Sequence, residues 1–127
     1  MLPTYEQMGD MLEEIAAEFP DAFFEGLDGG IQLEEQALPD PDFPPGEMYI
    51  LGEYCEDVLG RYINLYYGSF SALAQQEEWD EQTWEEELRI TFAHELTHHM
   101  EVRGGLHDLE DRDAAEMAMW RSQLQEN

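Results

Sequence analysis

All four histidines of this 127-residue sequence lie in one stretch, HELTHHMEVRGGLHD, which spans residues 94–108. His94 and His98 are four residues apart, so on a helix both imidazoles emerge from one face, one turn apart. Two neutral imidazole nitrogens in this arrangement can each bind the same zinc ion at about 2.0–2.1 Å. Glu95 lies about 100° around the helix axis from His94, beside such an ion. The spacing therefore predicts two metal ligands and a general base that takes a proton from water.

A catalytic zinc takes three protein ligands and leaves one position for water. Three residues are candidates for the missing ligand: Glu101, His107 and Asp108. Glu101 follows His98 by three residues and lies roughly on the same helix face. The other two candidates follow Gly104-Gly105, where the chain can fold back over the helix end. The spacing alone leaves the third ligand open.

The remaining polar residues of the region have weaker roles in this hypothesis. His99 falls on the side of the helix that carries Leu88 and Phe92, which predicts a core or supporting position instead of metal ligation. An oxyanion could be stabilised by Arg61 or by a tyrosine of the segment 61–67, and nothing in the sequence selects one. The alternative for the whole motif is an ordinary polar helix face.

The flanking sequence predicts one small α+β domain that covers residues 1–127, with a short mixed or antiparallel sheet. A capping box at Thr4 and Gln7 predicts the start of an amphipathic helix. The further expected elements are a short helical turn at 21–27, strands at 31–33, 48–54 and 61–69, and a Pro-rich surface loop at 38–47. The last two strands are expected to pair antiparallel. Asp80 or Thr83 should cap a helix that carries the histidines and ends at Gly104-Gly105, and a last helix should start near Glu110.

The charge of the chain excludes several classes of partner. There are 31 acidic residues against five basic ones, all of them Arg, and the formal net charge is −26. Such a field repels phosphates, so we expect neither nucleic acid nor an anionic membrane surface as a partner. Solubility alone can account for this charge, and the functional alternative is a basic peptide or protein as substrate or partner.

The sequence also bears on the compartment. Cys55 is the single cysteine, so no disulfide can form within the chain, as is typical of a reducing compartment. The first residues lack the basic and apolar regions of a signal peptide, and no stretch is long and apolar enough to span a membrane. We therefore expect a cytoplasmic, monomeric protein.

The stretch HELTHHMEVRGGLHDLEDRD, with MYILGEY and GRYINLYYGSF before it, resembles the zincin-like metallopeptidase family, also called minimal zincins. The resemblance covers most of the chain, from MLEEIAAEFPDAFFEGLDGGI onward. Many members carry H-E-x-x-H-x-x-G-x-x-D with the closing Asp as third zinc ligand. This sequence departs from that pattern, because Glu101 stands at the Gly position and Gly104 at the Asp position. The resemblance therefore implies Asp108, four residues after Gly104, as the third zinc ligand.

The resemblance implies a zincin fold, in which a few strands pack on the helix of the active site. It also implies a zinc-dependent metallopeptidase-like hydrolase, with Zn²⁺ bound by His94, His98 and Asp108 and with Glu95 as the catalytic base. Two other classes of function remain open. One is a metal-binding protein without turnover, such as a sensor or a buffer. The other is an acidic interaction protein that binds a basic partner.

Overall fold

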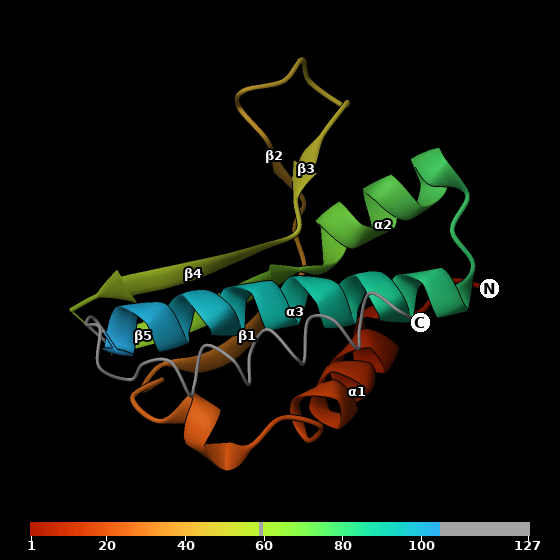
Figure 1. Ribbon diagram of the computed structural model, residues 1–127. Helices are drawn as coiled ribbons and strands as arrows, with labels where there is room; N and C mark the ends of the chain where they lie inside the picture. Colours follow the sequence, from red (N-terminus) through yellow and green to blue (C-terminus); the bar gives the residue numbers. More distant parts are fainter. Residues whose placement is uncertain (59, 105–127) are drawn as a thin grey trace.

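The main sheet is mixed and three-stranded, with strand order β1-β5-β4, in a computed structural model that describes residues 1–58 and 60–104 (Figure 1). The elements are α1 (Tyr5–Ala16), the 3₁₀ helix η1 (Asp21–Phe24), β1 (Gly30–Glu34), β2 (Leu38–Pro39), β3 (Tyr49–Ile50), β4 (Gly52–Asp57), β5 (Gly60–Tyr66), α2 (Tyr67–Glu77) and α3 (Glu81–Gly104). β1 runs parallel to β5, whereas β4 runs antiparallel to it. The small α+β fold with a mixed sheet is thus confirmed.

The first helix begins where the capping box predicts. The Thr4 hydroxyl accepts a hydrogen bond from the Gln7 backbone N–H at 3.1 Å, and the Gln7 side chain accepts one from the Thr4 N–H at 2.9 Å. These two bonds satisfy donors that a helix start leaves free. Met8, Leu12 and Ile15 form the buried stripe of α1.

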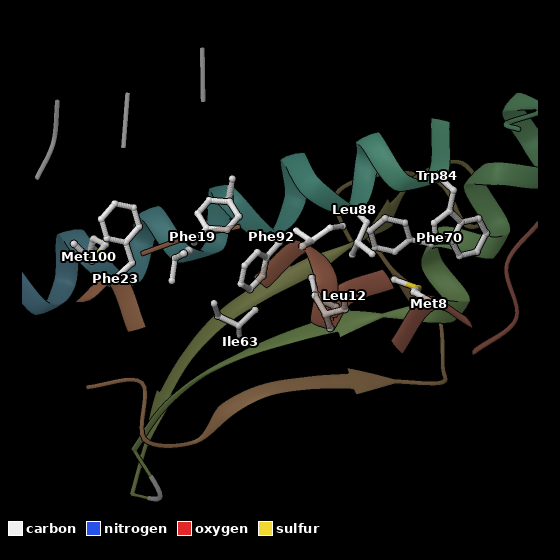
Figure 2. Close-up of a cluster of buried hydrophobic side chains, with 14 of the residues drawn as sticks. Met8, Leu12, Phe19, Phe23, Ile63, Phe70, Trp84, Leu88, Phe92 and Met100 are labelled. Atoms are coloured by element: carbon white, nitrogen blue, oxygen red, sulfur yellow. The ribbon is translucent and has the colours of Figure 1, made fainter. Parts of the chain in front are cut away.

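The longest helix, α3, has 24 residues and is capped by Asp80, whose carboxylate accepts from the Thr83 N–H at 2.7 Å. Its apolar stripe recurs every four residues and is buried, with members Trp84, Leu88, Phe92, Leu96 and Met100. Figure 2 shows side chains of this stripe packed in one cluster with Leu12 and Ile63. The core therefore lies between α3, α1 and one face of the main sheet. Although α3 is long, no helix among the described residues is apolar enough to cross a membrane.

The strand boundaries differ from those predicted. The segment 48–54 is not one strand, because the chain breaks at Leu51 between β3, which pairs with β2, and β4, which pairs with β5. β4 continues to Asp57, so the hairpin turn is short and lies near Val58. The loop predicted at 38–47 is confirmed except for the two residues of β2. The last predicted helix, from Glu110, lies outside the described residues.

The strand predicted at 61–69 ends at Tyr66, and Tyr67 begins α2. Gly68 makes this turn feasible. A Cβ on Gly68 would lie 2.4 Å from the Ala37 backbone nitrogen and 2.5 Å from the Gln36 carbonyl carbon. The start of α2 therefore packs directly on the backbone that leads into β2, and through β2 and β3 this contact helps to place residues 49–52.

We expect Gly68→Ala to lower the free energy of unfolding by about 1–3 kcal/mol, because backbone atoms cannot yield to the new methyl group without shifting an element. Gly9→Ala is the matched control. Gly9 lies inside α1, and a Cβ there would meet only Leu33 Cδ2, at 4.0 Å, among the described residues. This change should raise the stability by about 1 kcal/mol, the difference in helix propensity. Urea unfolding measures both, and a neutral Gly68→Ala would contradict the close packing.

Candidate metal and hydrolytic site

The helix α3 presents His94 and His98 on the side that faces away from the core. Two residues along a helix correspond to a rotation of about 200°, so these histidines lie almost opposite Phe92 and Leu96. Both histidines are exposed, whereas the two apolar side chains are fully buried. Their imidazoles approach each other, with 3.0 Å between the two Nε2 atoms. The structure thus brings together the two residues predicted as metal ligands.

The distance between the two nitrogens suits a shared ion. Two nitrogens bound tetrahedrally to one zinc at its usual bond length lie about 3.3 Å apart. The His94 and His98 nitrogens need to move by only a few tenths of an ångström to reach this separation. Imidazole nitrogen is also a preferred donor for zinc. The two histidines therefore fit a zinc ion as two of its ligands.

The described residues do not supply the third ligand. Within residues 1–58 and 60–104, no group of three or more His, Cys, Asp or Glu side chains is placed to hold a metal ion. Glu101, which is exposed on α3, does not form such a group with the two histidines. The other candidates, His107 and Asp108, lie outside the described residues.

Glu95 is buried, with 7% of its surface exposed, although it is adjacent in sequence to the exposed His94. The position follows from the helix geometry, because Glu95 lies about 60° from Phe92 and about 100° from His94 around the axis. Burial raises the pKa of the Glu95 carboxyl above its ordinary value. The charge of His98 lowers this pKa, and the charge of Glu53 raises it further. A carboxylate with a raised pKa is a stronger base than an exposed one.

An open pocket of about 450 Å³ lies beside these residues, between α3 and the segment that joins β3 to β4. Its lining consists of Tyr49, Ile50, Leu51, Gly52, Ile90, Thr91, His94 and Glu95. The volume falls within the range of small-molecule and side-chain sites in proteins. One predicted metal ligand and the predicted base therefore border a space that a substrate can enter.

His99 is fully buried, as the sequence predicts for a supporting residue. Its Nε2 lies 2.7 Å from the Glu25 carbonyl oxygen, which can only accept, so Nε2 must carry the proton. The Nδ1 atom then accepts a hydrogen bond from the Tyr54 hydroxyl at 2.9 Å. Burial lowers the pKa of His99, which favours this neutral form. The network ties α3, next to His98, to β4 and to the residue after η1.

The sheet places β4, and not β5, at the edge next to α3. β5 is the central strand, because β1 pairs on one side of it and β4 on the other. Gly52 allows the close approach, since a Cβ there would lie 3.0 Å from Thr91 Cγ2 and 2.9 Å from Leu65 Cδ2.

The residues considered for oxyanion stabilisation are engaged elsewhere. Each makes a hydrogen bond with another partner: Arg61 with Glu56, Tyr62 with Asp57, Tyr66 with Glu53 and Tyr67 with the Pro3 carbonyl. Burial, together with the bond to Glu53, raises the pKa of Tyr66 to about 12. All four residues belong to the described part of the chain, and none of them lines the pocket beside His94 and Glu95.

Tyr49 lines that pocket instead, and sequence reasoning missed it. Within the described part of the chain, its hydroxyl makes no hydrogen bond. The sequence shows Tyr49 only as an aromatic residue of an expected strand. Its place near the histidines depends on the break at Leu51, which local patterning does not reveal.

Comparisons with known proteins place the chain among its relatives. No family model and no curated protein matches it. A solved structure of a conserved hypothetical protein (TTHA0227) from Thermus thermophilus is similar, with 37% sequence identity and a TM-score of 0.68. The match covers 80% of this chain and 98% of that chain. With this identity over nearly the whole relative, the chain belongs to the same protein family as the Thermus thermophilus protein.

Proposed function

We propose that this protein is a zinc-dependent metallopeptidase-like hydrolase of the zincin type. The observation that carries the proposal is the 3.0 Å approach of the His94 and His98 Nε2 atoms, with Glu95 lining the same pocket as His94. The packing of α3 along a mixed sheet, with β4 as the neighbouring edge strand, supports the proposal. A polar helix face without function would not require a buried carboxylate beside two converging imidazoles.

His94 and His98 would hold the ion, with Asp108 as the proposed third ligand. When bound, zinc supplies a Lewis acid that lowers the pKa of water toward neutrality and polarises a carbonyl group. Glu95 takes a proton from the attacking water and later gives it to the leaving amine.

The outer edge of β4 would hold an extended peptide. The Tyr66 N–H donates to the Leu51 carbonyl at 3.0 Å, so Leu51 faces β5. Because the pattern alternates along an antiparallel pair, the backbone groups of Gly52 and Tyr54 face the open edge. A substrate backbone that pairs there lies beside Glu95 and the pocket.

Tyr49 is our candidate for stabilising the oxyanion. Its hydroxyl has no partner within the described residues, and it lines the pocket with Glu95 and His94. A hydroxyl donor in this position strengthens its hydrogen bond as negative charge develops on the carbonyl oxygen. Its role differs from that of Tyr54, whose hydroxyl donates to His99 and positions the helix.

The first test concerns the metal and the base. We expect about one zinc per chain, most of which is lost when His94 or His98 is replaced by Ala. Glu95→Gln should keep the zinc but lower kcat by at least about 100-fold, because an amide cannot act as a base. Elemental analysis and hydrolysis of a peptide library measure the two effects.

Two further results of this experiment are informative. Asp108→Asn should weaken zinc binding more than Glu101→Gln does, and the opposite ranking would assign the third ligand to Glu101. Full zinc content in the His94→Ala/His98→Ala double variant would place the metal elsewhere. Zinc binding without any difference between wild type and Glu95→Gln would favour a metal sensor or buffer.

The second test concerns Tyr49. We expect Tyr49→Phe to lower kcat by about 100-fold with little change in KM, because the hydroxyl acts only as charge develops. Tyr62→Phe is the control, since its hydroxyl donates to Asp57 at 3.0 Å, and its kcat should stay unchanged. A Tyr49→Phe variant as active as wild type would exclude the hydroxyl from the reaction.

The third test concerns the charge of the substrate. The net charge of −26 should attract cationic peptides and repel anionic ones. We expect kcat/KM to rank cationic above neutral above anionic peptides of matched sequence at low salt. The ranking should weaken as the Debye length falls from about 10 Å at 0.1 M salt to about 3 Å at 1 M. Equal rates at low salt would show that the charge does not select substrates.

A further inference from the structure

The pocket beside His94 and Glu95 has a chemical character that differs from the composition of the chain. Among the described residues, Glu95 is the only acidic one in its lining, and no Arg lines it. Apart from Glu95 and His94, the lining is apolar or weakly polar: three aliphatic side chains, Tyr49, Thr91 and the backbone of Gly52. In a chain where 31 of 127 residues are acidic, an apolar wall beside the site is a local exception.

We infer that this pocket binds a bulky apolar side chain, aliphatic or aromatic, of the substrate residue next to the cleaved bond, and that Ile90 determines this preference. The inference rests on the proposed hydrolytic function and names its substrate class. The pocket is continuous with the site, because His94 and Glu95 form its polar end. A side chain that enters it therefore belongs to a residue close to the reacting carbonyl.

Ile90 is the residue on which selection depends. It lies one helical turn before His94 on the same face of α3, and 42% of its surface is exposed. An aliphatic side chain so exposed at the mouth of a pocket gains from being covered by an apolar group of the substrate. Val102 has almost the same exposure, 43%, on the same helix but is not part of the described lining of the pocket.

Charged side chains fit the pocket poorly. Among the described lining residues, a Lys or Arg side chain would find no carboxylate except Glu95, which must stay available to water. An Asp or Glu side chain would meet the Glu95 carboxylate without any basic partner in that described lining apart from His94, a proposed metal ligand. A substrate side chain of either charge would thus lose its hydration in the pocket without gaining a compensating ion pair.

The pocket and the acidic field of the chain therefore select different parts of the substrate. The pocket selects an apolar residue at the cleaved bond, whereas the acidic field acts on substrate residues that lie outside the pocket. Together they describe a substrate class: an extended basic segment with a bulky apolar residue at the cleavage site.

The experiment uses the full chain loaded with zinc and peptides of equal net charge, in which the residues on either side of the cleaved bond are Leu, Phe, Ala, Lys or Glu. We expect kcat/KM for Leu or Phe at one of these positions to exceed that for Ala by at least about tenfold. Ile90→Ser should reduce this ratio several-fold, and Val102→Ser should leave it unchanged. Circular dichroism checks that both variants fold, which their exposed positions favour.

The outcomes separate this inference from the function on which it rests. Cleavage without preference for Leu or Phe, or an equal loss of preference in Ile90→Ser and Val102→Ser, would overturn the inference and leave the hydrolase intact. If wild type cleaves no peptide, the hydrolase fails, and binding of the same peptides, measured by titration calorimetry, decides the inference. Tighter binding of the Leu and Phe peptides that Ile90→Ser abolishes would support an apolar binding pocket, and equal binding of all peptides would overturn it.

Discussion

The burial of one apolar stripe on α3 sets the geometry of everything that surrounds the candidate site. Trp84, Leu88, Phe92 and Leu96 are completely buried against the core, so the helix cannot rotate without exposing them. Because a step of two residues turns the helix by about 200°, this burial directs His94 and His98 away from the core. The same side chains that stabilise the fold thereby aim the two imidazoles outward and toward each other.

A second stripe on the same helix, Thr91, Glu95 and His99, faces the edge strand β4. Each member has a distinct contact: Thr91 lies against Gly52, Glu95 borders the pocket, and His99 hydrogen bonds to Tyr54 and the Glu25 carbonyl. Glycine at position 52 permits this approach, because any Cβ there would strike side chains from both the helix and β5. Residues that pack the helix and residues of the candidate site therefore alternate along α3.

The acidic surface and the pocket act over different distances. Most of the 31 carboxylates contribute to a field that extends about a Debye length into solvent and depends on salt. The pocket between β3, β4 and α3 acts only on a side chain that enters it, and its lining is mainly apolar. In the function that we propose, charge governs which molecules approach, and shape and apolar contact govern which residue is held beside Glu95.

Local sequence patterns determined much of this protein. The Thr4–Gln7 capping box, the four-residue repeat of α3 and the pairing of His94 with His98 depend on residues within a few turns of one another, so periodicity reveals them. Only the tertiary structure decided three other features: the break at Leu51, the central position of β5, and the place of Tyr49 in the same pocket as His94. They arise from contacts between segments far apart in the chain, such as Gly68 on residues 36–37 and β1 on β5, which no local pattern encodes. The sequence could therefore identify the helix that carries the candidate site, whereas only the packing of distant segments determined which strand and which tyrosine lie beside it.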